Sequence, residues 1–222
     1  MIVVCGGIKG GGGKTTLATN LAVMRSLAGK DVLLVDADEQ DSALDFTVIR
    51  NQVFELKGGA GYTVIKLRGP SVRSEVLRMA SKYDDVIIDV GGRDNVGHRA
   101  ALLVANIYLV PIFPGSYDVW TLEAVASLIE EATAFNDHLK SFCFLNRADP
   151  QGADNEEAAQ IAKDTQGLIY LDQPIGFRKA FRRSASEGKA VVEYKPKDGK
   201  AVEEIERLYS SMFSELWSME KK

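Results

Sequence analysis

The stretch that decides the fold is Lys9-Gly10-Gly11-Gly12-Gly13-Lys14-Thr15-Thr16, close to the start of the chain. It lies between an apolar run, Ile2-Val3-Val4-Cys5, and an alanine- and leucine-rich segment that begins at Thr15. The apolar run predicts a buried strand and the second segment predicts a helix, so the glycines form the loop between them. Glycine tolerates the backbone angles that turn successive N–H groups toward one anion, and a helix N-terminus adds its dipole. The stretch therefore predicts a phosphate-binding loop.

The lysines make this prediction more specific. Gly13, Lys14 and Thr15 end the P-loop pattern G-x-x-x-x-G-K-[ST], in which the lysine reaches the β- and γ-phosphates and the hydroxyl ligates Mg²⁺. The leading glycine of that pattern would fall at position 8, which holds Ile8. The better match is a variant that Lys9 opens, K-G-G-x-G-K-T. The alternative is a flexible glycine turn with two solvated lysines, and it does not explain the placement between a strand and a helix.

The composition is that of an ordinary globular chain. The 222 residues are 45% hydrophobic and 26% charged with a net charge of −4, which suits a single domain over residues 1–222. The negative charge excludes binding of nucleic acid through the charge of the whole molecule, so any DNA contact needs a local basic patch. Cys5 and Cys143 lie in apolar runs without a C-x-x-C pair, which predicts buried reduced thiols. No apolar run has the length of a membrane span, and no signal sequence precedes the first strand, so we expect a cytoplasmic protein.

Apolar runs and helical periodicities alternate along the rest of the chain. After the first strand at 1–6, strands are expected at 32–36, 62–67, 86–90, 107–111, 142–146 and 168–171. Helices are expected at 14–29, from Ser42, at 71–82, 98–105, 120–135, 153–165, and from about Lys200. This alternation predicts an α/β fold, a mostly parallel, twisted β-sheet flanked by helices, in which Pro111 ends its strand. Ligands of such sheets bind beyond the carboxyl ends of the strands, where the glycine loop, Asp36 and Asp89 should meet.

Acidic residues follow two of the expected strands. Asp36 and Asp38 come after Val32-Leu33-Leu34-Val35 as D-x-D, and Asp89 follows Val86-Ile87-Ile88. An aspartate after a buried strand resembles a Walker B acid, which holds Mg²⁺ directly or through water. Acids also end strands and cap helices without any catalytic use, and that alternative is strongest for Asp36 and Asp38 when they are taken without the loop. Their position beside a phosphate-binding loop favours the metal.

The lysine that opens the loop resembles the deviant Walker A signature of the ParA/MinD ATPases. The resemblance implies a P-loop ATPase with ATP and Mg²⁺ as ligands. The implied nucleotide-binding residues of the loop are Gly10, Gly11, Gly12, Gly13, Lys14, Thr15 and Thr16. In that family the lysine at the position of Lys9 crosses a dimer interface and touches the nucleotide of the other subunit, whereas the alternative is an ordinary surface lysine. A homodimer that forms with ATP is therefore implied.

The resemblance also gives roles to the acids. The segment Val35–Ser42 resembles the family pattern D-x-D-P-Q-x-S, in which the first aspartate belongs to the metal and phosphate shell and the second orients the attacking water. The implied catalytic residues are Lys9, Lys14 and Asp38, and the implied metal ligands are Thr15, Asp36 and Asp89. Glu39 stands where the family usually has proline and Asp41 where it often has glycine, which affects the local turn more than the chemistry.

Three further segments match more weakly. Asp89–Asp94 resembles the switch after the Walker B strand, whose glycines would let it move with the γ-phosphate. Pro111–Trp120 resembles the P-x-x-P-S-x-x-D segment near the dimer interface of plasmid-type ParA proteins, with Gly115 in place of serine. A strand that leads into a capped helix explains it equally well. Asn146 resembles the strand-end asparagine that reads the adenine edge, which an amide suits because it both donates and accepts. A structural asparagine is the alternative.

A basic segment precedes the last helix. Residues 176–200 contain eight basic and three acidic residues, although the chain as a whole is negative. Four of the basic residues fall at helical spacing and would form one ridge: Arg178, Lys179, Arg182 and Arg183. ParA relatives bind nonspecific DNA through basic residues in this part of the chain, so these four are candidate DNA contacts, and phosphate contacts alone would be sensitive to salt. A solvated charged face is the alternative.

The leading hypothesis is a short plasmid-type ParA ATPase for DNA partition, because the chain begins at the first strand. ATP would close a sandwich dimer, the dimer would bind nonspecific DNA of the nucleoid, and a ParB-like centromere-binding partner would stimulate hydrolysis. The alternative cargoes are a chromosome origin or a protein organelle. A MinD-like membrane-cycling ATPase needs a basic amphipathic C-terminal helix, whereas here Glu203, Glu204 and Glu206 lie near its polar face, so no membrane partner is expected. A metabolic P-loop synthetase would leave Lys9 without a use.

Overall fold

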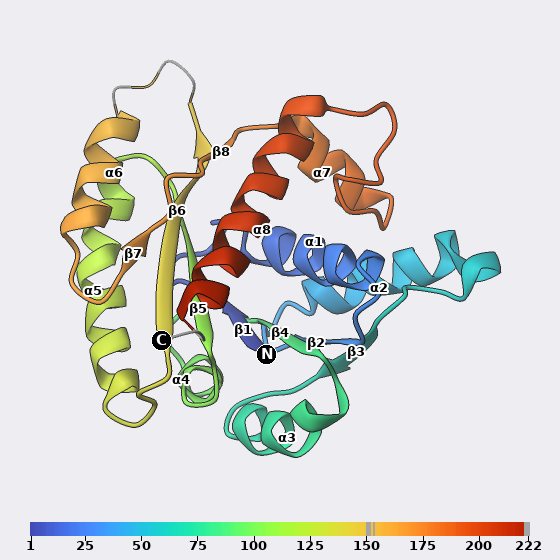
Figure 1. The fold of residues 1–222 in the computed structure, drawn as a ribbon, viewed down its shortest axis with the longest axis horizontal. Helices are drawn as coiled ribbons and strands as arrows, with labels where there is room; N and C mark the ends of the chain where they lie inside the picture. The colour runs from blue at the N-terminus through green and yellow to red at the C-terminus, as the bar shows by residue number, and fades with distance from the viewer. Residues whose placement is uncertain (150–151, 153, 220–222) are drawn as a thin grey trace.

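The computed structural model describes residues 1–149, 152 and 154–219 (Figure 1). Its strands are Ile2–Cys5 (β1), Val32–Asp36 (β2), Thr63–Lys66 (β3), Asp85–Asp89 (β4), Ile107–Ile112 (β5), Lys140–Ala148 (β6), Ile169–Tyr170 (β7) and Ile175–Gly176 (β8). They form one eight-stranded sheet in the order β3-β2-β4-β1-β5-β6-β7, with β8 paired to β6. Every pairing is parallel, so the prediction of an α/β fold built on a parallel sheet is confirmed.

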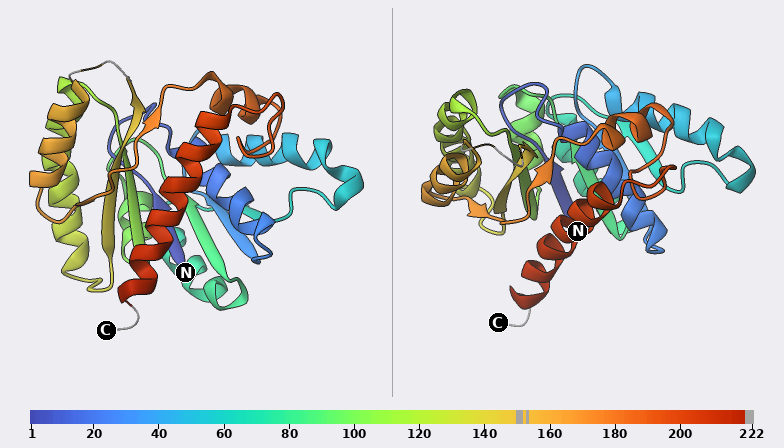
Figure 2. Two further views of the ribbon diagram at one scale, coloured as in Figure 1. Left: turned by 45° about the horizontal axis from the view of Figure 1, so that its top comes forward. Right: turned by 90° about the horizontal axis from the view of Figure 1, so that it is seen from above.

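Helices cover both faces of the sheet (Figures 1 and 2). One face packs against α1 (Lys14–Leu27), α2 (Ser42–Val53), α7 (Lys179–Ser186) and α8 (Gly199–Met219). The other face packs against α3 (Ser71–Met79), α4 (Val96–Leu102), α5 (Ser116–Thr133) and α6 (Asp154–Asp164). Short 3-10 turns follow α2 and α3, at Glu55–Lys57 and Ala80–Lys82. Neighbouring residues of β1 divide between the two cores, since Val3 and Cys5 join one and Val4 the other, as a pleated strand requires.

Two expected boundaries are wrong for identifiable reasons. Pro111 lies inside β5, which continues to Ile112. Because β1 pairs with β5 only as far as Leu109, the missing N–H of Pro111 removes no bond to β1. The helix expected to begin at Trp120 begins at Ser116, and Gly115 precedes it with φ 141°. No helix among the described residues is long and apolar enough to cross a lipid bilayer.

The register of the central strands brings the expected site together. Asp36 of β2 pairs with Asp89 of β4, and Cys5, where β1 leads into the glycine loop, pairs with the other side of Asp89. The carboxyl ends of three strands therefore meet at one edge, as expected for a parallel sheet. This edge holds the candidate site.

Candidate functional site

The glycine loop is fixed at its end by a side chain from β6. Gly13 has φ 88° and precedes the first turn of α1, and a Cβ there would lie 2.4 Å from Nδ2 of Asn146. Asn146 donates from that nitrogen to the carbonyl oxygen of Gly12 at 2.7 Å. The asparagine expected to read adenine therefore holds the loop in this structure, and its use in base recognition stays a prediction.

Lys14 is folded against the same loop. Its side chain is buried, and Nζ donates to the carbonyl oxygen of Lys9 at 2.7 Å. Burial lowers the pKa of Lys14, whereas the nearby carboxylates of Asp89 and Asp38 raise it. Lys9, by contrast, is exposed. One lysine of the loop is thus folded into the site and the other lies at its surface, and the expected contact of Lys9 with a second subunit stays a prediction.

Asp89 is a buried carboxylate that lies near the Thr15 hydroxyl but accepts no hydrogen bond of normal geometry from any residue that the structure describes. It is 0% exposed, and neither Oδ1 nor Oδ2 has a hydrogen-bond partner among the described residues. Burial raises its pKa to about 7, and Asp36 and Asp38 raise it as well, whereas the nearby Thr15 hydroxyl and Lys14 lower it. A buried acid in this state favours a cation that completes its coordination.

Asp36 is equally buried, but each of its carboxylate oxygens accepts a hydrogen bond. Its Oδ1 accepts from the amide of Asp38 at 3.1 Å, and its Oδ2 accepts from the amide of Leu44 at 2.9 Å. Burial raises the pKa of Asp36, and these amides lower it. Each oxygen accepts one hydrogen bond and keeps a second lone pair that could bind a metal. The expected ligand role of Asp36 stays a prediction, and what the structure shows is a carboxylate that orders the turn carrying Asp38.

Arg68, two residues after the end of β3, holds that turn in place. Its Nη1 donates to the carbonyl oxygen of Asp36 at 2.6 Å, and Nη2 pairs with the carboxylate of Asp41. Asp41 has φ 55°, a left-handed conformation that explains why glycine is common at this position in the family pattern. Lys66 pairs with Asp41 too. Arg68 was not predicted, because an arginine after a strand carries no signal until the partners are known.

The segment after β4 packs closely on the loop and on Asp38. A Cβ on Gly92 would lie 2.6 Å from Cα of Gly10, and a Cβ on Gly91 would lie 3.1 Å from Oδ1 of Asp38. Asp38 also accepts from the amide of Gln40 at 3.3 Å. The two glycines are therefore needed for close approach in this state, in addition to the mobility that the sequence suggests.

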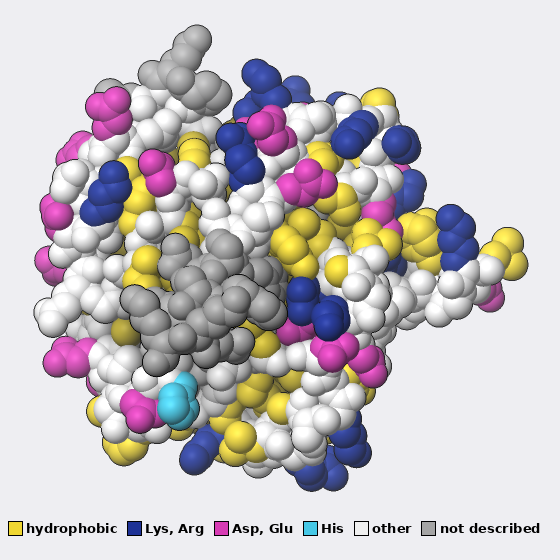
Figure 3. Space-filling view, viewed as in Figure 1, with side chains coloured by type: hydrophobic (Ala, Val, Ile, Leu, Met, Phe, Trp, Pro, Cys, Tyr) yellow, Lys and Arg dark blue, Asp and Glu magenta, His cyan; other side chains and the backbone are white. Residues whose placement is uncertain are grey.

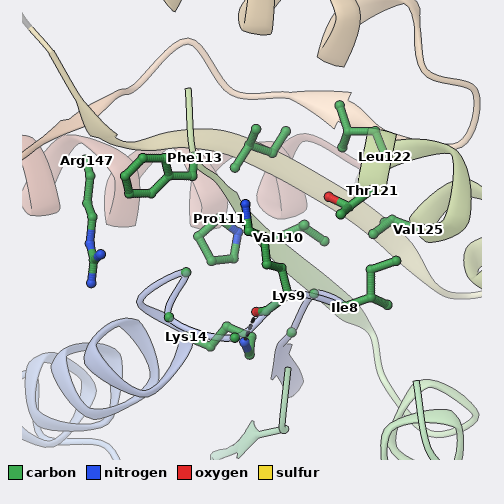
Figure 4. Close-up of a pocket in the computed structure, with 16 residues that line it drawn as sticks. Ile8, Lys9, Lys14, Val110, Pro111, Phe113, Thr121, Leu122, Val125 and Arg147 are labelled. Carbon is green, nitrogen blue, oxygen red and sulfur yellow. Dashed lines mark hydrogen bonds between the residues drawn. The ribbon is translucent and has the colours of Figure 1, made fainter. Parts of the chain in front are cut away.

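Two cavities meet at the start of α1. The larger one, here called the loop cavity, has a volume of about 780 Å³ and lies between the glycine loop, Asp38–Gln40 and Gly91–Asn95. The second, here called the α7 cavity, has a volume of about 610 Å³ and lies between Asn146, Phe177 and α7. A smaller cavity of about 230 Å³ lies between the loop, the end of β5 and α5 (Figure 4). The first two share lining residues, and the loop cavity has the more polar lining while the α7 cavity has the more apolar one.

The donor set suits magnesium bound with phosphates. Thr15 and Asp89 supply a hydroxyl and an unpartnered carboxylate, and no group of three or more His, Cys, Asp or Glu among the described residues could hold a metal by itself. Mg²⁺ usually keeps several waters and takes phosphate oxygens in addition to one or two carboxylates. The site therefore fits Mg²⁺ together with a nucleotide better than a metal held by protein alone.

The candidate DNA contacts separate into two kinds. Lys179, Arg182 and Arg183 are exposed on α7, and Figure 3 shows lysine and arginine side chains gathered over this part of the surface. Arg178 instead pairs with Glu204 of α8, with Nη2 to Oε1 at 2.6 Å. Glu204 was expected near the polar face of the last helix, but it is 9% exposed, since it also accepts from the amide of Gly176.

Two other residues of the site gave no signal in the sequence. Arg147 lines both the loop cavity and the α7 cavity. His98 of α4 is 1% exposed, with Nε2 3.0 Å from the hydroxyl of Tyr108 and Nδ1 3.4 Å from the carbonyl oxygen of Arg93. Burial lowers the pKa of His98 to about 4. His98 therefore lies between β5 and the segment that packs on the glycine loop.

Comparison with known proteins agrees with this geometry. A family model described as the CobQ/CobB/MinD/ParA nucleotide binding domain matches residues 2–191. The chain is 30% identical over 214 residues to the maintenance of carboxysome distribution protein A of Gloeobacter kilaueensis, which covers 94% of this chain and 90% of the relative. The fold is similar to that of a Borrelia burgdorferi protein described as a plasmid partition protein, solved with AMPPNP, at TM-score 0.76 and 19% identity, over 96% of this chain and 98% of that one. It is also similar to MinD of Pyrococcus horikoshii with Mg-ADP, at TM-score 0.72 and 20% identity over 95% of both chains.

Proposed function

The chain belongs to the ParA/MinD superfamily, the CobQ/CobB/MinD/ParA nucleotide-binding proteins, and from this we propose that it is an ATP hydrolase that positions a cargo by binding and leaving DNA. The observation that carries the proposal is the unpartnered carboxylate of Asp89, buried near Lys14 beneath the glycine loop. Such a group costs free energy in the nucleotide-free protein, and a ligand that binds the carboxylate would offset this cost.

Each residue of the site has a defined use in this proposal. Backbone N–H groups of the loop and the ammonium group of Lys14 bind the phosphates, and Thr15 and Asp89 hold Mg²⁺. Bound Mg²⁺ would neutralise charge that develops on the phosphate oxygens. Asp38 orients the water that attacks the γ-phosphate, and Asp36 keeps the Asp38 turn in place through its two backbone hydrogen bonds.

Lys9 supports a dimer that depends on ATP. It lies exposed at the rim of the loop, while its own carbonyl holds the Lys14 side chain. Binding of phosphates would draw Lys14 away from that carbonyl, which frees the start of the loop to rearrange. We propose that Lys9 then reaches the nucleotide of a second copy, as the resemblance to the ParA/MinD ATPases implies.

The exposed basic residues of α7 support contact with DNA phosphates. Lys179, Arg182 and Arg183 form the ridge, while Arg178 anchors it to α8 through Glu204. The chain as a whole carries a net charge of −4, so this ridge has to act locally. Contacts of this kind bind any sequence, which suits travel over the nucleoid in a cytoplasmic protein.

Two cargoes are supported by different observations. The plasmid-partition version includes a ParB-like centromere-binding partner, and similarity of fold to a plasmid partition protein is in line with it. The organelle-positioning version is favoured by the sequence relative named for carboxysome distribution, which is 30% identical over nearly the whole of both chains. Because that relative is closer in sequence, we place a protein organelle alongside the plasmid as a cargo to test.

The DNA step can be tested with random-sequence duplex DNA and ATP, ADP or no nucleotide, over a range of salt. We expect binding only with ATP, a loss of at least about tenfold in Arg182→Ala/Arg183→Ala, and a log–log salt slope smaller by about two. The matched control is Arg73→Ala/Arg78→Ala, which removes the same charge from exposed positions on α3, on the other face of the sheet. ATP affinity is measured in parallel, because Arg182 also lines the α7 cavity.

The same assay separates the alternatives. Wild-type protein that binds ATP but no DNA in any state would contradict the DNA step, and binding to liposomes under those conditions would favour a membrane-cycling ATPase. Equal losses in the α7 and α3 variants would mean that overall charge, and not the ridge, governs DNA binding.

A further inference from the structure

The backbone at Arg147 is unusual for its position inside a strand. Arg147 lies in β6 with φ 55°, and apart from glycine only Asp41 shares a positive φ among the described residues. The pairing of β6 with β8 shifts between Asn146 and Ala148, so Arg147 is the extra residue of a bulge. A left-handed residue in a bulge redirects its side chain, and such features concentrate at binding sites.

The redirected side chain is exposed at the point where the cavities meet. Its guanidinium lies 5.6 Å from the centre of the Phe113 ring, and Figure 4 shows the side chain alongside that ring, directed away from the strand. Arg147 lines the loop cavity, the α7 cavity and the smaller cavity under the loop. An exposed cation over a phenylalanine ring is a weak interaction, and it does little more than offset the strained backbone. The contact with Phe113 alone therefore gives no reason for the bulge.

The loop cavity and the α7 cavity share three residues, Gly13, Thr16 and Arg147. A nucleotide with its phosphates in the first cavity and its base in the second has to pass these three residues. Gly13 and Thr16 belong to the start of α1, where backbone N–H groups and the helix dipole favour an anion. Arg147 comes from β6 and brings a charge to the same passage.

We infer that Arg147 is a nucleotide-binding residue that pairs with the α-phosphate, opposite the start of α1. This inference rests on the proposed function and deepens it, because it divides the phosphates between two cations. Lys14 reaches the β- and γ-phosphates, and Arg147 holds the part of the nucleotide that ATP, ADP and AMP have in common. Guanidinium suits this because it can donate two hydrogen bonds to one phosphate group.

The experiment uses Arg147→Gln, which removes the charge, and Arg147→Gly, which also relieves the left-handed backbone. Dissociation constants for ATP, ADP, AMP and adenosine are measured by titration calorimetry or by competition, with the melting temperature of each nucleotide-free protein. The control is Arg73→Gln, which removes an exposed arginine of α3 that lines neither cavity.

We expect both Arg147 variants to bind ATP, ADP and AMP about tenfold more weakly and adenosine as wild type does. We also expect Arg147→Gly to melt at the same or a higher temperature, because glycine adopts φ 55° without strain. If Arg147 only supported the fold, its replacement would lower the melting temperature. Weaker nucleotide binding at an unchanged or higher melting temperature therefore indicates a direct contact. The Arg73→Gln control should bind all four ligands normally.

Other results would overturn the inference. Wild-type affinity for ADP in Arg147→Gly would remove Arg147 from the nucleotide site while leaving the ATPase proposal intact, provided that the wild type binds ATP. A loss confined to ATP would place the guanidinium at the γ-phosphate and contradict the α-phosphate contact. Wild-type protein that binds no nucleotide would overturn the proposed function and this inference with it.

Discussion

The two ends of β4 carry aspartates with opposite surroundings. Asp85, at the amino end, is 2% exposed and pairs with Arg25 at 2.6 Å, and the N-terminal ammonium lies 3.8 Å away. Asp89, at the carboxyl end, is 0% exposed and has no hydrogen-bond partner among the described residues. The same strand therefore ends in a closed ion pair on one side and in an open carboxylate on the other.

The difference between Asp85 and Asp89 indicates which end of β4 contributes to stability and which end is available for function. A buried carboxylate is tolerated when a cation and donors surround it, as at Asp85. At Asp89 the protein leaves the carboxylate incomplete at the edge where the glycine loop and the Asp38 turn meet. At Asp85, groups of the protein itself supply partners for the carboxylate. We propose that a nucleotide with Mg²⁺ supplies them at Asp89.

The largest expected effect is the loss of ATP hydrolysis in Asp89→Asn. Without the carboxylate, Mg²⁺ loses its protein anion, and we expect the hydrolysis rate to fall by about 10²–10³-fold. The nucleotide-free protein should at the same time gain about 1–2 kcal/mol of unfolding free energy at pH 8, because Asn buries no charge. Steady-state hydrolysis and urea unfolding measure the two effects.

Asp85→Asn is the matched control for that comparison. It makes the same chemical change on the same strand, but it breaks the pair with Arg25, so we expect a loss of about 1–3 kcal/mol in stability and normal hydrolysis. If Asp89→Asn hydrolysed ATP normally, or if both variants lost stability alike, the contrast between the two ends of the strand would be wrong.

The contrast also shows what the sequence could predict. Apolar runs followed by Asp36 and Asp89 predicted that these acids would meet the glycine loop, since parallel strands end at one edge. The sequence did not predict which acid would be satisfied, because the donors to Asp36 come from Leu44 and from its own turn, in a geometry known only after folding. The strand β8 was missed because its two residues lie in no apolar run, whereas the equally short β7 lies in the apolar run Leu168–Leu171 and was predicted.

The buried histidine His98 extends the comparison, and we expect its effect on stability to be of intermediate size. His98 has partners for both ring nitrogens, and burial lowers its pKa to about 4. The unfolded chain takes up the proton below about pH 6.5, whereas the folded protein takes it up only near pH 4. Stability from His98 is therefore complete above pH 6.5 and falls as the pH decreases, by about 3 kcal/mol at pH 4.

Urea unfolding of wild type and His98→Gln between pH 4 and 8 tests this. The stability difference between the two proteins should shift in favour of the variant as the pH falls, because glutamine takes up no proton. His138→Gln, at an exposed histidine, is the control. A difference that stays constant with pH would mean that His98 is not held neutral by burial.

The smallest effect concerns Arg68, which braces the carboxyl end of β2 next to Asp89. Arg68→Ala removes the side-chain donor to the carbonyl of Asp36 and leaves the amide of Leu67 at 3.1 Å, so we expect the turn that places Asp38 to loosen while the phosphate loop stays intact. We expect kcat for ATP hydrolysis to fall about tenfold with little change in ATP affinity, as for a group that positions the attacking water. Lys66→Ala is the matched control, because the side chains of Lys66 and Arg68 both pair with Asp41, and of these two side chains that of Arg68 also donates to the Asp36 carbonyl. Equal losses in both variants would assign the effect to the left-handed Asp41 turn, and an unchanged kcat in Arg68→Ala would show that the bonds from Asp36 hold Asp38 by themselves.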